Sequence, residues 1–281
     1  MNEFNAALVC CSDARCSNER EQIDLLCNSL EQIGIHSHKG EYLFAASEYR
    51  AFDPIKKASE LMCFYDNTSI DMIFDISGGN LSNQILPYID YKRISMSDKM
   101  FWGYSDLTAL INAIYTKTQK PSVLYQIRNI IGADSAVQTQ RVKEYFNGNN
   151  AALFDWSYEW INGTSMRGVA VGGNIRCFLK LAGTPYFPDM KNKILVLESY
   201  SGDALLMSSF LAQLEQLGVF QQINGILLGT FTHLDSMSSQ PDMTQLVMQA
   251  TKGTLPLAKT YEIGHHSDAK AIVIGEELIL Y

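Results

Sequence analysis

The sequence predicts an α/β fold built on a parallel sheet, because short apolar segments and amphipathic helical segments alternate along its first half. Residues 6–9 and 72–76 are apolar runs of the length typical of buried strands, and residues 23–33 between them carry apolar side chains at helical spacing. A strand, a helix and a further strand in that order give parallel strands with helices on both faces of the sheet. In such sheets the functional loops gather at the carboxyl ends of the strands.

Local signals mark where these elements begin and end. Gly34 is expected to close the first helix, since glycine tolerates the left-handed conformation that commonly follows a helix. Asp53 and Pro54 predict the start of the next helix, with Asp53 as its N-cap. The inward face of that helix is expected to hold three apolar side chains: Ile55, Ala58 and Met62.

The second half of the chain also mixes strands and helices. Residues 194–197 and 226–228 are apolar runs typical of buried strands, and residues 277–281 are expected to form a short terminal β segment. A helix between the first two runs ends at Gly218. Its expected apolar stripe consists of Met207, Phe210, Leu211, Leu214 and Leu217.

A polar and aromatic stretch without clear period, residues 127–162, separates the two halves, and its Asn-Gly pairs are turn signals. We interpret this stretch as an inter-domain connection. The sequence therefore predicts an N-terminal domain over residues 1–128, a connection over residues 129–165 and a C-terminal domain over residues 166–281.

The composition is that of a well-packed protein of two ordinary domains, with 281 residues, 47% of them hydrophobic and 19% charged. The net charge is −8 and no Lys/Arg cluster interrupts it, so neither nucleic acid nor an anionic membrane is an expected partner. No segment approaches the ~20 apolar residues needed to cross a bilayer, and the first residues lack the basic start of a signal peptide. We expect a cytoplasmic protein.

The cysteines show no disulfide or zinc framework. Cys10, Cys11 and Cys16 lie close together, but no second Cys or His pair at zinc spacing accompanies them. We expect reduced, mostly buried thiols and no metal site. The six are Cys10, Cys11, Cys16, Cys27, Cys63 and Cys177.

Ser105 lies where a predicted strand turns into a predicted helix. The strand ends near Trp102, Gly103 allows a sharp turn, and the helical spacing of apolar residues begins after Asp106. Free backbone N–H groups and the helix dipole favour negative charge at such a turn. Hydrolases place a nucleophile there when the substrate becomes an oxyanion. The alternative is that Ser105 only caps the helix.

A serine nucleophile needs a base, and the chain offers five histidines. His36 and His38 share one face of a strand but have no further metal ligands nearby, so they are expected at the surface. His233 follows a buried strand and is a candidate for lining a pocket. His265 and His266 lie in a glycine-led polar turn, which can present an imidazole freely.

Glu198 is the candidate carboxylate, because it directly follows the apolar run at residues 194–197, where an unpaired charge is costly. A partly exposed strand end is the alternative. The N–H groups of Gly79 and Asp106 are candidates for an oxyanion hole, since the Gly78-Gly79 pair lets the main chain approach a substrate; an ordinary turn is the alternative. No dinucleotide or P-loop fingerprint is present.

Several motifs in this order resemble the LD-carboxypeptidase family of serine peptidases, which includes muramoyltetrapeptide carboxypeptidases and microcin C7 self-immunity peptidases. The segment that matches most closely is the nucleophile motif from Gly103 to Leu110. The others are Gly34 to Arg50, Gly78 to Asp90, Gly172 to Ile175, Gly183 to Tyr186, Ile194 to Glu198, and Gly264-His265.

The resemblance implies roles for these residues. Ser105 would be the nucleophile, His265 the general base and Glu198 the residue that orients it, while Gly79 and Asp106 would form the oxyanion hole. His265 is preferred to His266 because the family's histidine directly follows the glycine. Gly78 and Asn174 would bind substrate.

The resemblance also implies an architecture. An N-terminal parallel-sheet (flavodoxin/Rossmann-like) domain would carry the serine, a C-terminal α/β domain would carry the Glu and the His, and the active site would lie in the cleft between them. The family implies a homodimer, and the triad mechanism requires no cofactor.

The sequence departs from the family pattern near the glycine pair. Ser77 stands in place of an arginine, and Asn80-Leu81 in place of an aromatic-led pair. Val273 stands where the family often has proline. The first two departures lie at the pocket rim, so they concern the substrate more than the chemistry.

The implied function is hydrolysis of an amide bond near a free C-terminus, with the L,D-bond of murein tetrapeptide as the expected substrate. An immunity-type peptidase that cleaves a peptidyl or aminoacyl nucleotide is the alternative, and the Ser-Asn-Gln continuation of the glycine loop resembles that branch. A non-catalytic ligand-binding protein of the same fold is a third possibility.

Overall fold

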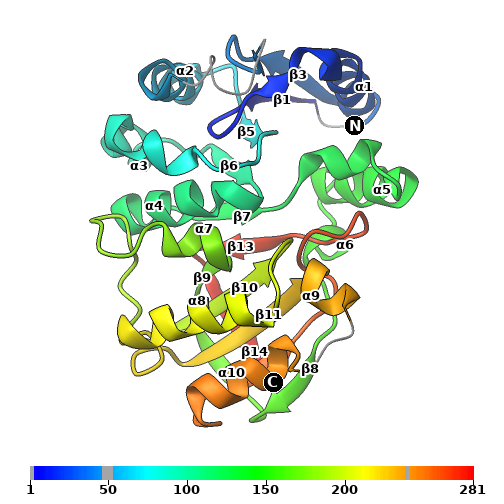
Figure 1. Cartoon of the computed structure of the whole chain (residues 1–281). Helices are drawn as coiled ribbons and strands as arrows, with labels where there is room; N and C mark the ends of the chain where they lie inside the picture. Colours follow the sequence, from blue (N-terminus) through cyan, green and yellow to red (C-terminus); the bar gives the residue numbers. More distant parts are fainter. Residues whose placement is uncertain (1–2, 46–52, 238–240) are drawn as a thin grey trace.

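The computed structural model describes residues 3–45, 53–237 and 241–281. The chain forms two α/β regions, one around each of two six-stranded sheets (Figure 1). Residues 46–50 of the family-like segment from Gly34 to Arg50 lie outside the described ranges. None of the described helices is long and apolar enough to span a membrane.

The first sheet has the order β13-β7-β6-β5-β1-β3, and all neighbouring pairs are parallel except β13–β7. Its strands are β1 (Phe4–Val9), β3 (Ile35–Lys39), β5 (Met72–Asp75), β6 (Met100–Gly103), β7 (Ser122–Leu124) and β13 (Ile272–Ile274). The α-helices of this part of the chain are α1 (Arg20–Glu31), α2 (Pro54–Asp66), α3 (Tyr91–Ser95), α4 (Thr108–Thr118), α5 (Ser135–Phe146) and α6 (Ala151–Phe154). The 3-10 turns are η1 (Ser17–Glu19), η2 (Ser82–Gln84), η3 (Leu86–Tyr88), η4 (Ser105–Leu107) and η5 (Ile127–Ile131), and β2 (Arg15–Cys16) pairs with β4 (Phe44–Ala45).

The second sheet has the order β14-β9-β10-β11-β12-β8, with four parallel strands between two antiparallel edges. Its strands are β8 (Glu159–Asn162), β9 (Met166–Asn174), β10 (Lys193–Ser199), β11 (Gly225–Phe231), β12 (Leu257–Lys259) and β14 (Glu277–Leu280). The helices of this part are α7 (Ile175–Leu179), α8 (Ala204–Gln216), α9 (Thr232–Ser236) and α10 (Met243–Thr251). The sheet curls, so that the Tyr158 hydroxyl just before β8 donates to the Tyr281 carbonyl just after β14, at 2.7 Å.

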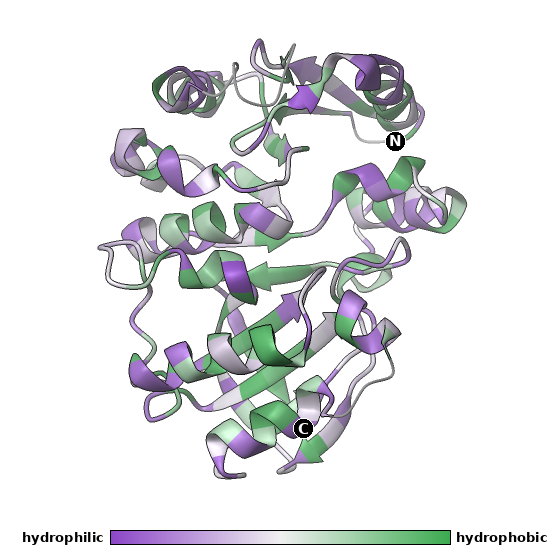
Figure 2. Cartoon of the chain, viewed as in Figure 1, coloured by the Kyte–Doolittle hydropathy of each residue, from purple (hydrophilic) through white to green (hydrophobic). Residues whose placement is uncertain are grey.

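Both faces of the first sheet are buried, as the parallel arrangement requires. In β1, Ala6 and Leu8 pack into one apolar cluster, and Ala7 and Val9 point the other way into a second. That second cluster continues into the other region, where Val196 of β10 belongs to it. Figure 2 shows the corresponding hydrophobic segments in the strands of both regions.

Helix α4, which follows the turn that contains Ser105, is joined to the second region by buried hydrogen bonds. Asn112 Nδ2 donates to the Gly172 carbonyl at 2.8 Å, and the Gly172 N–H donates back to Asn112 Oδ1 at 2.9 Å. The Thr108 hydroxyl accepts from the Asn174 N–H at 3.0 Å. These bonds fix the turn that carries Ser105 against the end of β9.

The structure confirms the α/β class and the parallel first sheet. Gly34 follows α1 with a φ of 83°, and the Asp53 carboxylate caps α2 by accepting from two backbone N–H groups. One expectation for α2 is wrong: Ile55 is 58% exposed, whereas Ala58 and Met62 are buried. Ile55 lies in the first turn, on the side of the helix that faces away from the sheet.

The predicted connection, residues 129–165, contains α5, α6 and β8, and β8 pairs with β12 at the edge of the second sheet. In the predicted C-terminal domain, residues 166–281, β13 crosses back and extends the first sheet beside β7. On α8 the expected apolar stripe is buried at Met207, Leu211 and Leu214, and Phe210 is partly buried. The expectation is wrong for Leu217, which follows the helix and is 37% exposed.

Candidate active site

Ser105 lies at a strained turn between strand and helix. Strand β6 ends at Gly103, Tyr104 is extended, and Ser105 has a left-handed φ of 53°. That conformation costs an L-residue roughly 1–2 kcal/mol and is held by the surrounding packing. A Cβ on Gly103 would approach the Leu107 Cβ to 2.7 Å, so the turn is tight enough to require glycine there.

Glu198 and His265 meet at the carboxyl end of the second sheet. Glu198 is the penultimate residue of β10, and its Oε2 lies 2.6 Å from His265 Nδ1. Their side chains are 1% and 9% exposed, so the pair is almost wholly removed from water. The alternative of a partly exposed strand end at Glu198 is wrong. A buried carboxylate on Nδ1 orients an imidazole and leaves Nε2 for a further partner.

Tyr104 connects the serine turn to this pair. Its ring lies 4.3 Å from the His265 ring, centroid to centroid, and its hydroxyl donates to the Gly264 carbonyl at 3.1 Å. Burial, with a further contribution from the charge of Glu198, raises the Tyr104 pKa well above its usual value, so the hydroxyl stays protonated. The Tyr200 ring lies 5.2 Å from the same imidazole.

Tyr104, the residue before Ser105, thus contacts His265 with the two rings tilted by 47°. Among the described residues the Ser105 hydroxyl makes no hydrogen bond to His265. In unliganded enzymes such bonds are often long and shorten when substrate binds.

The other histidines lie outside this arrangement. His266 is exposed and its ring makes no hydrogen bond within the described residues. His233 is also exposed, on α9, with Nδ1 3.3 Å from the Gly202 carbonyl. His36 and His38 lie at the surface of β3, beside Glu31 and Asn5 respectively. No group of three or more His, Cys, Asp or Glu in the described ranges could hold a metal ion.

The six cysteines are free, as expected. Cys10, Cys11 and Cys177 are buried, whereas Cys16 and Cys63 are exposed. The expectation of mostly buried thiols is therefore only half right. Burial raises the pKa of Cys10 and Cys11, with a smaller contribution from Asp75.

Gly79 adopts a backbone conformation that only glycine accepts easily here. Its φ is 119°, and a Cβ would lie 2.1 Å from an oxygen of Asp13. The preceding Gly78 has open space where a Cβ would be, and its carbonyl accepts from the Asp13 N–H at 3.2 Å. A side chain would therefore fit at position 78, whereas position 79 requires glycine.

The Asp106 side chain is fully buried under the glycine loop. Its carboxylate accepts from the Ser12 hydroxyl at 2.6 Å and the Ser82 N–H at 2.9 Å, and it forms an ion pair with Lys180. Burial alone would raise the Asp106 pKa, but Lys180 and these hydrogen bonds outweigh it and lower the pKa. Asp106 is therefore held as a carboxylate.

Asn174 ends β9 and begins α7. Its side-chain oxygen accepts from the Cys177 N–H at 3.3 Å, so it caps that helix. Within the described residues its amide nitrogen makes no hydrogen bond. The cap explains why an asparagine fits there, and a contact with substrate remains a proposal.

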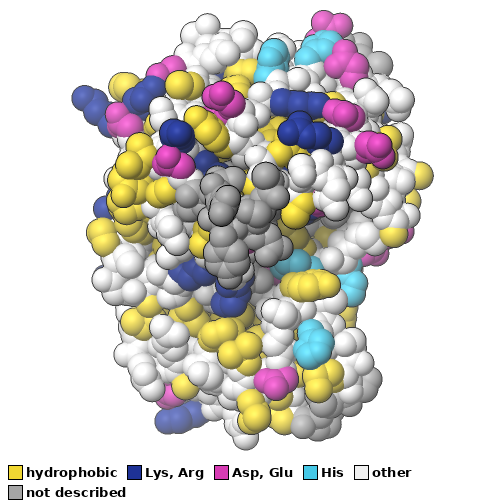
Figure 3. All heavy atoms as spheres, turned by 45° about the horizontal axis from the view of Figure 1, so that its top comes forward, with side chains coloured by type: hydrophobic (Ala, Val, Ile, Leu, Met, Phe, Trp, Pro, Cys, Tyr) yellow, Lys and Arg dark blue, Asp and Glu magenta, His cyan; other side chains and the backbone are white. Residues whose placement is uncertain are grey.

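Two of the cavities lined by described residues lie near different ends of the strands. One of about 620 Å³ is lined by Tyr200, Leu206, Thr232 and His233 and so adjoins His265 through Tyr200. On the face seen in Figure 3, Lys and Arg side chains gather on one side of the middle, and His and hydrophobic side chains gather on the other.

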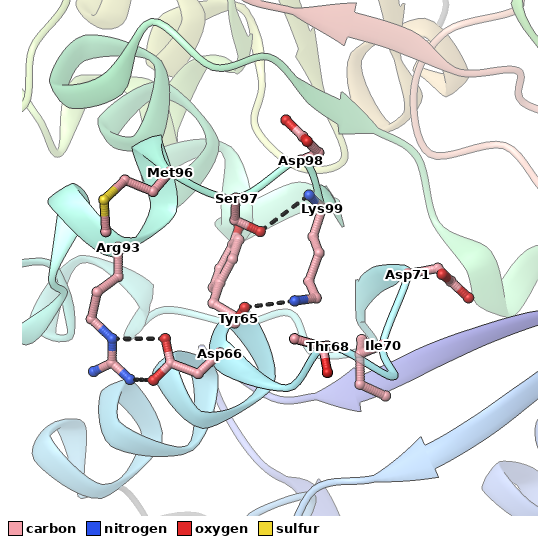
Figure 4. A pocket seen from close by; sticks show the side chains of 10 residues that line it. All are labelled: Tyr65, Asp66, Thr68, Ile70, Asp71, Arg93, Met96, Ser97, Asp98 and Lys99. Carbon is pink, nitrogen blue, oxygen red and sulfur yellow. Dashed lines mark hydrogen bonds and ion pairs between the residues drawn. The ribbon is translucent and has the colours of Figure 1, made fainter.

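The second cavity, of about 430 Å³, lies by the amino ends of strands β5 and β6 of the first sheet (Figure 4). Its lining includes Asp71 just before β5 and Lys99 just before β6, so it is at the amino ends of the strands. Arg93 and Asp66 form an ion pair at its rim. Since functional loops of parallel sheets lie at the carboxyl ends, this cavity is not the candidate active site.

Sequence reasoning missed four contributors to the site: Ser12, Tyr104, Arg176 and Lys180. Arg176 and Lys180 follow Gly172-Gly-Asn at a spacing of four, which places both on one side of a helical turn. That spacing was a usable signal. The role of Ser12 depends on a contact across 94 residues and leaves no local trace.

Profiles of two domains match nearly the whole chain. The LD-carboxypeptidase N-terminal domain matches residues 6–125, and the LD-carboxypeptidase C-terminal domain matches residues 167–280. A protein of Treponema pallidum that is named as a carboxypeptidase is 29% identical, covering 92% of this chain and 82% of the relative. The murein tetrapeptide carboxypeptidase of Pseudomonas aeruginosa is 23% identical, covering 92% and 88%. The microcin C7 self-immunity protein MccF of Escherichia coli is 22% identical, covering 89% and 83%.

Solved structures show the same fold. MccF in complex with glutamyl sulfamoyl guanosine superposes with a TM-score of 0.88 at 18% identity, covering 98% of this chain and 92% of that one. The muramoyltetrapeptide carboxypeptidase of Oxalobacter formigenes gives a TM-score of 0.81 at 18% identity, covering 98% and 94%. With two domain profiles in order and the fold in agreement, the chain belongs to the LD-carboxypeptidase family.

Proposed function

We propose that the protein is a serine carboxypeptidase that hydrolyses an amide bond near a free C-terminus through a Ser105–His265–Glu198 triad. The observation that carries the proposal is the buried 2.6 Å contact between Glu198 and His265, beside the strained turn of Ser105. A left-handed serine and a buried carboxylate both cost free energy, and such costs cluster at functional sites.

The chemistry follows from these positions. His265 accepts the Ser105 proton as the hydroxyl attacks the amide carbonyl, and Glu198 stabilises the resulting imidazolium. The N–H groups of Gly79 and Asp106 receive the developing oxyanion. His265 then gives the proton to the departing amine. In the second half of the reaction, His265 takes a proton from water as the water attacks the acyl-enzyme, and it returns that proton to the Ser105 oxygen as the acid product leaves. No step requires a cofactor.

For the substrate we propose the L,D-bond of murein tetrapeptide, in line with the relative named as a murein tetrapeptide carboxypeptidase. An aminoacyl or peptidyl nucleotide is the second candidate, supported by the Ser-Asn-Gln continuation of the glycine loop and by the MccF relative. We place the protein in the cytoplasm as a homodimer, on the family resemblance. Size-exclusion chromatography with light scattering tests the assembly.

A fluorophosphonate probe tests the catalytic proposal directly. Wild-type protein should be labelled on one serine, identified as Ser105 by peptide mapping, and Ser105→Ala should not be labelled. An unlabelled wild type would support the alternative of a non-catalytic binding protein. Mass spectrometry after incubation with murein tetrapeptide and with an aminoacyl sulfamoyl adenosine then decides between the substrates.

A further inference from the structure

We propose that Arg176 and Lys180 are positioning residues that hold the Gly79 loop of the first region in its oxyanion-binding geometry. The inference rests on the proposed function, because it assigns a role to the loop in that reaction. Both residues belong to the second region, at α7 and directly after it. They reach across the junction to the loop at the end of β5.

Three successive peptide units of the loop are fixed by hydrogen bonds. The Gly78 carbonyl accepts from the Asp13 N–H at 3.2 Å. In the next unit, the Gly79 carbonyl accepts from Arg176 at 2.9 Å, and the Asn80 N–H donates to Asp13 Oδ1 at 3.1 Å.

The third unit completes the series. The Asn80 carbonyl accepts from Lys180 Nζ at 2.8 Å, while the Leu81 N–H donates to the Ser12 hydroxyl at 3.2 Å. Arg176 also binds the Asn80 side-chain oxygen at 2.8 Å, so its guanidinium spans two acceptors of the loop.

One backbone N–H group of these three peptide units is not used by the hydrogen bonds above. Among the described residues, the N–H of Gly79 has no hydrogen-bond acceptor. Because a peptide unit is planar and trans, the bond that holds the Gly78 carbonyl turns the Gly79 N–H to the opposite side. A backbone donor that is held in place but has no acceptor is what an oxyanion hole requires.

Lys180 links the loop that carries the Gly79 N–H to the second proposed donor, the Asp106 N–H. The same ammonium that holds the Asn80 carbonyl pairs with the Asp106 carboxylate, and Ser82 binds Asp106 through both its N–H and its hydroxyl. The backbone at Asp106 is therefore fixed relative to the Gly79 loop. The two proposed donors are held by one network.

Arg176 and Lys180 also bear on the departure at position 77, where serine stands in place of the family's arginine. Position 77 has serine, and Ser77 is buried with its hydroxyl donating to Asp75 at 2.5 Å and accepting from the Ser12 N–H at 3.0 Å. It therefore brings no positive charge to the loop. Arg176 and Lys180 supply that charge from the other region.

The test uses Arg176→Met, because Arg176 is not part of the buried ion pair of Asp106. The rate of fluorophosphonate labelling and kcat should both fall by about tenfold or more, with KM changed by less than about threefold, since the lost interaction acts on the transition state. A tetrahedral peptidyl boronate should lose affinity by a similar factor, whereas binding of the peptide product should not change. Arg176→Lys should recover part of the loss, because one ammonium can still reach the Gly79 carbonyl.

The matched control is Arg93→Met, which removes an arginine that also contacts two groups, Asp66 and the Met62 carbonyl. Arg93 lies at the cavity by the amino ends of the first sheet's strands, away from the proposed site. It should label at the wild-type rate. Thermal melting of each variant shows whether it is folded. A wild type that is not labelled would refute the proposed function, whereas a labelled wild type with an Arg176→Met variant of equal rate and equal boronate affinity would refute this inference alone.

Discussion

At the scale of single residues, the site combines groups that are costly by themselves. Glu198 is a buried carboxylate, Ser105 has a left-handed backbone and Asp106 is a buried charge. The two buried carboxylates each have a partner, His265 for Glu198 and Lys180 for Asp106. Such costs are typical of functional sites, where local preferences are overridden by the surrounding fold.

The choice between the adjacent histidines can be tested by separate substitutions. His265→Ala removes the imidazole that meets Glu198, so kcat/KM should fall by about 10³-fold or more. His266→Ala changes an exposed ring and should leave kcat/KM within about threefold. Steady-state kinetics on the substrate identified by mass spectrometry gives both values. Loss of turnover only in His266→Ala would reverse the assignment.

The charge of Glu198 can be separated from its shape. Glu198→Gln keeps the side-chain size and an oxygen that can accept a hydrogen bond from His265 Nδ1, but it removes the charge that stabilises the imidazolium. We expect kcat to fall by about 10²–10⁴-fold, with the melting temperature equal to or above the wild-type value, because a buried carboxylate is replaced by a neutral group. Kinetics and calorimetry on the same preparation measure the two quantities. Full activity in this variant would show that Glu198 is only structural.

At the scale of elements, the carboxyl ends of β5, β6, β9 and β10 bring the site together. The loop after β5 supplies Gly79, and the turn after β6 supplies Ser105. The end of β10 supplies Glu198, while α7, after β9, supplies the cations that hold the glycine loop. Short turns after buried strands thus place groups from distant parts of the sequence within hydrogen-bonding range.

The contact between α7 and the serine turn predicts a pH-dependent stability. The Asp106 pKa is lowered in the folded protein, so its stabilising effect is complete above its ordinary pKa of about 4 and is lost as the pH falls through the lower folded value. Lys180→Met removes the cation from a buried pair, in which Lys180 is 16% and Asp106 0% exposed. The free energy of unfolding should fall by about 3 kcal/mol at pH 7.

Below about pH 4 this difference should shrink, because the Asp106 carboxyl becomes protonated in the variant and then in the wild type. Urea unfolding at pH 7 and pH 3 measures it. Lys120→Met is the control, since its partner Asp98 is fully exposed and solvent screens such a pair, so its loss should change stability little at either pH. An equal loss at both pH values would mean that Lys180 acts by packing alone.

At the scale of the whole molecule, the two sheets share one apolar cluster and behave as parts of one core. Strand β13, near the C-terminus, lies in the first sheet beside β7. Helix α4 of the first region is bonded to β9 of the second through Asn112 and Gly172. The chain therefore crosses between the regions more than once, and the proposed active site lies where they are joined.

This crossing also explains what the sequence could and could not predict. Gly34, Asp53 and the apolar strands are local signals, and the structure confirms the elements they mark. The helices and strand within residues 129–165 were not predicted, because polar and aromatic residues mask their period and β8 depends on pairing with β12. Family motifs predict the candidate site residues, whereas the bonds of Arg176 to the glycine loop depend on contacts between residues distant in the sequence.

A shared core predicts a single unfolding transition. Trp102 lies in the first sheet and Trp160 in the second, so variants in which Trp156 and one of these two are replaced report on each region separately. We expect both to give the same urea midpoint within error, coincident with far-UV circular dichroism. Asn112→Leu, which leaves the Gly172 N–H and carbonyl without partners, should lower that midpoint in both reporters by an equal amount, corresponding to about 2–4 kcal/mol. Two different midpoints for the two reporters, or an Asn112→Leu shift in only one of them, would show that the regions fold independently. The junction at the proposed active site would then be a contact between two separately folded domains.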